Sequence, residues 1–110
     1  MTWDDLLDRL RSADLDPVEE IYMENYGKIL ARERKEFHGR NFRCTYGVLS
    51  CSGLQFEAYV FPSLGHLEDF LAVIGDDPWW IPRQNVVLHF PLSDPAAFAG
   101  ILDAVSVPAR

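Results

Sequence analysis

Residues 41–62 have the sequence NFRCTYGVLSCSGLQFEAYVFP, and the rest of the chain is expected to pack around them. The stretches 41–50 and 54–61 are rich in β-branched and aromatic residues, which favours two strands. Cys51-Ser52-Gly53 lies between them and predicts a three-residue loop with Gly53 in the left-handed conformation. Residues 41–62 are therefore predicted to form a β-hairpin.

The loop length determines which residues face one another across this hairpin. A three-residue loop sets Val48 opposite Phe56 and gives the hairpin one apolar face. A two-residue loop at Ser52-Gly53 would set Val48 opposite Glu57 instead. Because a slip of one residue exchanges the two faces, we expect the register that keeps one face apolar.

The two cysteines, Cys44 and Cys51, lie on or beside the first strand of the hairpin. Seven extended residues span roughly 23 Å, whereas a disulfide needs Cα atoms within about 7 Å. The sequence therefore predicts no bond between them, with Cys44 as a small buried residue and Cys51 as a loop thiol.

The composition predicts one folded domain over residues 1–110, with a frayed tail at 107–110. Hydrophobic residues make up 48% of the chain and charged residues 25%, which argues against disorder. No apolar run approaches the roughly 20 residues needed to span a membrane. Trp3, Asp4 and Asp5 stand where a signal peptide would be basic and then apolar. We therefore expect a soluble, cytoplasmic protein.

The formal net charge of −7 is unevenly distributed. Residues 1–27 carry −6, residues 28–43 carry +4, and residues 44–110 carry −5. A negative protein is repelled by nucleic acid and by anionic membranes, which disfavours both as partners. The basic segment 28–43 is the exception.

Four helices are predicted from apolar spacing and from their first residues. Thr2 and Ser63 are suitable N-caps, and Asp16-Pro17 with Glu19 is a strong start signal. The predicted helices cover residues 2–10, a second segment that begins at Asp16-Pro17 and ends at Gly39, a third from Ser63 to Gly75, and a fourth that begins near Ser93-Asp94.

The strands complete the predicted topology. Residues 85–91 form a third strand, and the prolines of segment 76–82 predict a loop before it. The order is then α-α-β-β-α-β-α, an α+β fold. A parallel crossover would join the second and third strands. The first hairpin strand would lie between them, giving a small, mainly antiparallel three-stranded sheet of order 2-1-3, half of a ferredoxin-like arrangement, with helices packed on it.

No constellation of catalytic or metal-binding residues is evident in the sequence. His38, His66 and His89 have no metal-ligand spacing, and no serine lies in a nucleophile motif. We therefore predict no metal, no cofactor and no enzymatic activity. An enzyme that uses His66 or His89 with a nearby carboxylate is the third alternative.

Two surfaces are candidates for binding. Lys35, Arg40 and Arg43 belong to the basic segment, which predicts docking of an acidic partner or of phosphates. Trp79 and Trp80 are adjacent in a proline-flanked loop. Because neighbouring tryptophans cannot easily both face one core, one is expected to pack inward and the other to serve as an interface anchor.

These observations favour a non-catalytic protein–protein interaction module, an acidic protein of inhibitor or adaptor type. Its expected partner is another protein, for which the negative charge favours a basic one, or a second copy of itself in a homodimer. The alternative is a small-molecule binding or sensing domain with a pocket between sheet and helices near Trp79-Trp80. The residues expected to line such a pocket are Tyr46, Tyr59, Trp79, Trp80 and His89.

Overall fold

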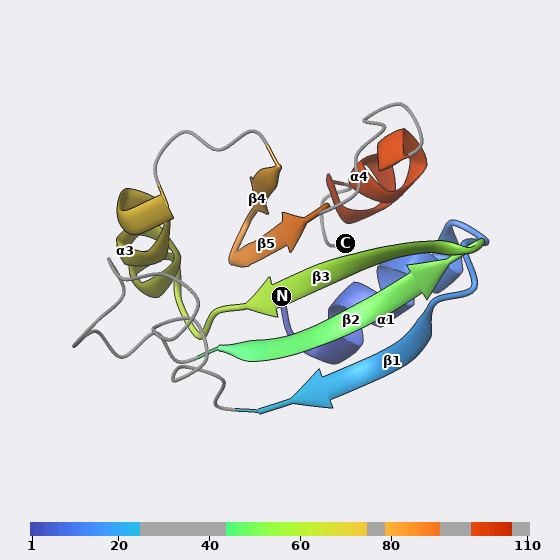
Figure 1. Cartoon of the computed structure of the whole chain (residues 1–110), viewed down its shortest axis with the longest axis horizontal. Coiled ribbons are helices and arrows are strands. Elements are labelled where there is room, and N and C mark those ends of the chain that lie inside the picture. Colours follow the sequence, from blue (N-terminus) through green and yellow to red (C-terminus); the bar gives the residue numbers. More distant parts are fainter. Residues whose placement is uncertain (25–43, 75–78, 91–97, 107–110) are drawn as a thin grey trace.

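The computed structural model describes residues 1–24, 44–74, 79–90 and 98–106. Within these ranges it has three helices and one antiparallel sheet of five strands in the order β1-β2-β3-β5-β4 (Figure 1). The elements are α1 (Trp3–Ser12), β1 (Val18–Met23), β2 (Thr45–Cys51), β3 (Leu54–Val60), α3 (Leu64–Ile74), β4 (Trp80–Arg83), β5 (Val86–His89) and α4 (Ala99–Ser106). No helix among these is long and apolar enough to cross a membrane.

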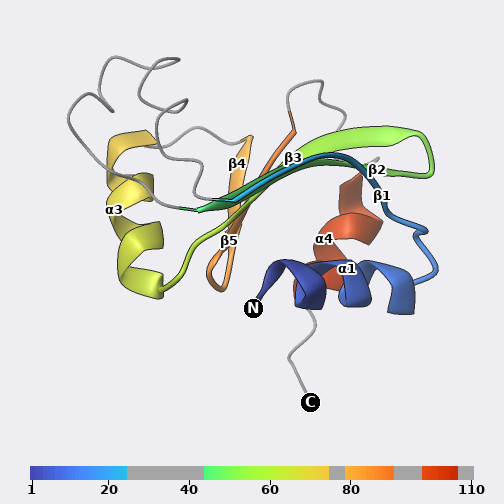
Figure 2. The same ribbon diagram turned by 90° about the horizontal axis from the view of Figure 1, so that it is seen from below.

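Helices pack on both faces of the sheet. α1 and α4 lie side by side against one face (Figure 2), where they form an apolar core with Leu49, Phe56 and Leu88. α3 packs on the opposite face through Leu67 and Phe70. The strand residues of this second core are Tyr46, Tyr59, Trp80 and Val87. Because side chains alternate along a strand, the central strands contribute to both cores.

The predicted caps of α1 and α3 are confirmed. Thr2 Oγ1 accepts the backbone N–H of Asp5, and the Asp5 carboxylate accepts the N–H of Thr2, which completes a capping box. Ser63 Oγ accepts the N–H of His66 at the start of α3. Each of these bonds joins residues three positions apart, so both caps are local in sequence.

The hairpin is present, but its predicted register is wrong. β2 and β3 join through a two-residue turn, so that Val48 lies opposite Glu57. Ser52 and Gly53 have φ angles of 52° and 81°, as in the type I′ turn that matches the twist of a hairpin. The prediction assumed that one face of the hairpin meets solvent. Because helices pack on both faces, the criterion of a single apolar face does not select the register.

Residues 18–23 form β1, where the sequence predicted a helix. Ile21 lies opposite Val48 of β2, and a bulge interrupts the register between Glu19 and Ile21. Asp16, the predicted cap, has a φ of 45°, whereas an N-cap residue has an extended backbone. The few apolar residues here fit a strand as well as a helix, and pairing with β2 satisfies the backbone. The predicted continuation of this helix beyond residue 24 lies outside the described residues.

β4 occupies residues 80–83, where the sequence predicted a loop. It lies at one edge of the sheet, and an edge strand tolerates a proline such as Pro82. β3 and β4 are each antiparallel to β5, so they are parallel to each other. The chain therefore does pass through α3 between two parallel strands, but the second of them is β4.

The predicted three-stranded sheet of order 2-1-3, with elements in the order α-α-β-β-α-β-α, is therefore wrong, and so is the half ferredoxin-like arrangement. The sheet has five strands, with β3 between β2 and β5. Residues 85–91 were correctly expected to hold a strand, which the structure places at Val86–His89. Its immediate neighbours are β3 and β4, because a tight turn returns the chain directly from β4 to β5.

Cys44 and Cys51 are not joined by a disulfide, and both are buried. Cys51 is the last residue of β2, so the expectation of a loop thiol is wrong. Burial raises the pKa of Cys51 to about 11 and that of Cys44 to about 12. At neutral pH both side chains therefore hold their protons and neither is a thiolate nucleophile.

Gly47 of β2 lets the Trp3 indole lie against the sheet. A Cβ at position 47 would stand 2.3 Å from Cη2 of Trp3 and 2.5 Å from the carbonyl oxygen of Ile21. The indole also contacts the Tyr22 ring, and its Nε1 donates to the carboxylate of Glu19. Trp3 therefore joins α1 to β1.

Candidate functional sites

One row of residues crosses all five strands on the face that α3 covers. From β1 to β4 its members are Ile21, Val48, Glu57, His89 and Trp80, each directly opposite the next. Trp80 is buried and Ile21 is exposed, so burial decreases from β4 toward β1. Glu57 and His89 form a polar pair at the centre of this cross-strand row.

Glu57 accepts hydrogen bonds on both carboxylate oxygens. Oε1 lies 2.6 Å from Nδ1 of His89. Oε2 accepts the hydroxyl of Tyr46 at 2.6 Å and that of Tyr59 at 3.2 Å. Because an ionised carboxylate can only accept, the hydrogen of this contact lies on Nδ1. Nε2 is then the ring nitrogen with a free lone pair in the neutral imidazole.

The network keeps Glu57 in its charged form. Burial acts to raise the pKa of Glu57, but hydrogen bonds from His89 and Tyr46 outweigh it and lower the pKa from its usual 4.5. The side chains of Glu57 and His89 are 23% and 19% exposed. The pair is therefore ionisable, largely shielded and still in contact with water.

Acid should weaken the fold through Glu57. Because the pKa of Glu57 is lower in the folded than in the unfolded chain, unfolding takes up a proton below pH 4.5. The stabilisation is present above that pH and is lost as the pH falls through the folded pKa. We expect Glu57→Gln to reduce the loss of unfolding free energy between about pH 6 and about pH 3, measured by urea denaturation. An unchanged pH dependence in the variant would contradict this assignment.

Trp80 holds the imidazole ring of His89 in a fixed plane. The two rings stack with centroids 4.0 Å apart and planes 16° apart. Trp80 in turn packs against Tyr59 and Phe70, at centroid distances of 5.4 Å and 5.6 Å. The His89 ring is therefore oriented at one face by Trp80 and at Nδ1 by Glu57.

The two tryptophans predicted to bind a partner differ in burial. Trp80 lies on β4 and is buried, while Trp79 just before it is half-buried. Partner binding by these two residues stays a prediction. Lys35, Arg40 and Arg43 lie outside the described residues.

Four of the five residues expected to line a ligand pocket lie together around the Glu57 carboxylate. Tyr46, Tyr59 and His89 each hydrogen bond to Glu57, and Trp80 stacks on His89. Glu57 was not among the predicted residues, because the predicted register placed it on the face opposite Tyr46. The two-residue turn was the signal that would have placed it among these aromatic residues.

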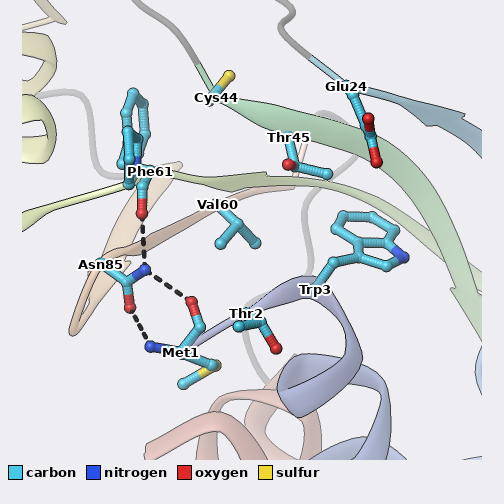
Figure 3. A pocket seen from close by; sticks show the side chains of 10 residues that line it. Met1, Thr2, Trp3, Glu24, Cys44, Thr45, Val60, Phe61 and Asn85 are labelled. Atoms are coloured by element: carbon cyan, nitrogen blue, oxygen red, sulfur yellow. Dashed lines mark hydrogen bonds between the residues drawn. The ribbon is translucent and has the colours of Figure 1, made fainter.

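A separate pocket of about 650 Å³ lies between the start of α1 and the sheet (Figure 3). The Asn85 amide nitrogen donates to the carbonyl oxygens of Met1 and Phe61, and its Oδ1 accepts from the Met1 nitrogen. These bonds hold the beginning of α1 against the end of β3. The amide of Asn85 therefore serves the fold.

β1 forms the other edge of the sheet, and all six of its residues are exposed. Ile21, Tyr22 and Met23 are 41–46% exposed, and Val18 is 55% exposed. Val18, Ile21 and Met23 lie on the α3 face of the sheet, where they pair with β2 residues of that face. The edge is therefore apolar as well as accessible.

Comparison with protein-family models, with curated proteins and with solved structures found no match for this chain.

Proposed function

We propose that the chain is a protein-interaction module of inhibitor or adaptor type that binds an extended segment of a basic partner along β1. The observation that carries this proposal is the exposed edge strand with four large apolar side chains, Val18, Ile21, Tyr22 and Met23. An extended peptide can add to such an edge through backbone hydrogen bonds, while alternate side chains give specificity.

The two edges of the sheet differ in how well they are protected. β4 is four residues long and includes Pro82, which has no N–H to offer a further strand. β1 is six residues long, has no proline, and pairs with β2 on one side within the described residues. Only the bulge after Glu19 interrupts it. β1 is therefore the edge suited to strand addition.

The charge around β1 favours a basic partner. Residues 12–24 contain Asp14, Asp16, Glu19, Glu20 and Glu24 and no lysine or arginine. A partner strand that alternates apolar with basic residues would contact Ile21 and Met23 and offset these carboxylates. The same charges would speed association at low salt. A second copy would instead bring like charges together.

Substitution of two β1 side chains should weaken partner capture. We expect Ile21→Thr/Met23→Thr to reduce capture of a partner by the immobilised protein at least about tenfold, which corresponds to about 1.4 kcal/mol. Threonine suits a strand, so the fold should persist. The readout is the amount of partner retained from native lysate at low and at high salt, with thermal unfolding as the folding check.

Leu64→Thr is the matched control, because Leu64 is 58% exposed and lies outside β1, at the start of α3. Leu64→Thr should retain as much partner as the unmodified protein does. High salt should reduce the amount of partner retained by each of these two proteins. Equal capture by the β1 variant, or a partner that salt does not displace, would contradict the proposal. If the unmodified protein forms a stable homodimer and the β1 variant is a monomer, the partner at β1 is a second copy and not a basic protein.

A further inference from the structure

We propose that His89 is the general base of a hydrolytic site for small uncharged esters, on the cross-strand row beside Trp80 and Glu57. This activity goes beyond partner binding and does not depend on it. The site lies in the centre of the sheet face, whereas strand addition uses the outer edge of β1.

The first argument is the orientation of the imidazole. The 2.6 Å contact with Glu57 fixes the hydrogen on Nδ1 and leaves the lone pair on Nε2. Stacking on Trp80 fixes the ring plane. A histidine that merely filled space would need neither constraint. A base with one defined acceptor atom, held by a carboxylate, has the arrangement that general-base catalysis requires.

The second argument is charge compensation. When Nε2 takes a proton, the imidazolium lies against an ionised carboxylate, which stabilises it where water is largely excluded. Glu57 in turn is held by the hydroxyls of Tyr46 and Tyr59. Glu57 is therefore a positioning residue, and His89 is the residue that contacts the reacting water.

The third argument concerns the substrate. Toward β1 the row continues from Glu57 to the half-buried, apolar Val48. Neighbouring strands lie about 4.8 Å apart, so Val48 is roughly 10 Å from His89. An apolar acyl chain can extend over this distance. The carboxylate of Glu57 and the net charge of −7 disfavour an anionic substrate.

In the reaction, Nε2 accepts a proton from water while the water oxygen bonds to the ester carbonyl carbon. The imidazolium then returns that proton to the leaving oxygen as the carbon–oxygen bond breaks. The products are a carboxylic acid and an alcohol, and neutral His89 is regenerated. The thiols of Cys44 and Cys51 stay protonated and take no part.

The test uses p-nitrophenyl butyrate as probe, followed by release of p-nitrophenol. His89→Gln should lower kcat/KM about 100-fold, and Glu57→Gln should lower kcat about tenfold with little change in KM. His66→Gln is the matched control, because His66 is exposed and hydrogen bonds to Ser63; it should leave the rate unchanged. Equal rates for the unmodified protein and His89→Gln would overturn the proposal.

The substrate class has its own readout. The unmodified protein should show kcat/KM that rises from the acetate to the butyrate and hexanoate esters. Val48→Thr keeps the shape of the side chain but adds a hydroxyl, so it should reduce this increase. No dependence on acyl length in the unmodified protein would overturn the assignment of an apolar substrate.

Two further measurements keep the proposal open to refutation if His89→Gln fails to fold. Diethyl pyrocarbonate should modify His89 of the folded protein, as located by mass spectrometry, because Nε2 holds a free lone pair. An unmodified His89 would overturn the proposal. Hydrolysis should be slower in deuterium oxide, because a general base transfers a proton in the reaction. A burst of p-nitrophenol from an acyl-imidazole intermediate, without this isotope effect, would overturn the proposal and show that His89 acts as a nucleophile.

Discussion

Gly47→Ala is expected to lower the free energy of unfolding by about 1–3 kcal/mol, the range for a methyl group forced into a packed core. The new Cβ would meet Cη2 of Trp3 at 2.3 Å and the Ile21 carbonyl oxygen at 2.5 Å. The indole can move, but the carbonyl is part of the β1 backbone that pairs with β2. Urea denaturation, with its slope compared between variants, measures the effect.

Gly100→Ala is the matched control for this prediction. Gly100 lies in α4, and a Cβ there would meet nothing within 4 Å. Alanine should therefore stabilise the helix by about 0.5–1 kcal/mol. Opposite signs for the same substitution would establish that position 47 is limited by space. If Gly47→Ala is as stable as the unmodified protein, Trp3 does not lie against β2.

Trp80→Ala is expected to destabilise the protein by about 3–5 kcal/mol, the range for truncation of a buried aromatic residue. Trp80 is 8% exposed and contacts Tyr59, Phe70 and His89. Its removal leaves a cavity and also releases the His89 ring. Urea denaturation followed by tryptophan fluorescence and by far-ultraviolet circular dichroism would measure the change.

Trp79→Ala provides the comparison. Because Trp79 is half-buried, its replacement should lower the free energy of unfolding less than Trp80→Ala does. If both variants lose equal stability, the burial of Trp80 is not what stabilises this region. The same difference matters for partner binding. A double substitution of both residues would unfold part of the core, so binding by this segment must be tested at Trp79 alone.

The start signals at Thr2 and Ser63 predicted helix starts correctly. Thr2 and Ser63 cap helices through hydrogen bonds to residues three positions later. The start signal at Asp16-Pro17 is equally local, but the pairing of residues 18–23 with β2 overrides it. The strand predicted at residues 85–91 is also present, at Val86–His89. Its residues Val86 and Leu88 face one core, and Val87 faces the other.

The errors arose where distant parts of the chain decide the outcome. Residues 18–23 form a strand because β2 is available to pair with them, and no pattern within six residues shows this. The predicted hairpin register was wrong because it assumed one solvated face, whereas α1 and α4 pack on one face of the sheet and α3 packs on the other. Pro82 suggested a loop, but it lies on an edge strand where its missing N–H is not needed.

The candidate site was predictable only in part. Tyr46, Tyr59, Trp80 and His89 could be proposed together as aromatic and titratable residues near the sheet. Glu57 shares a face with Tyr59 in any register, but it was not joined to Tyr46 because the predicted register, shifted by one residue, set the two on opposite faces. The exposed apolar surface of β1 was not predicted for a different reason: its apolar residues were assigned to the buried face of a helix.

The pairing of α1 with α4 affects how the protein folds during synthesis. Arg9 of α1 donates to the carbonyl oxygen of Val105 in α4, 96 positions later in the chain. The apolar side of α1, with Leu6 and Leu10, is therefore not fully covered until nearly all of the described chain has left the ribosome. Contacts so distant in sequence slow folding. The nascent chain presents this apolar helix to chaperones throughout that delay.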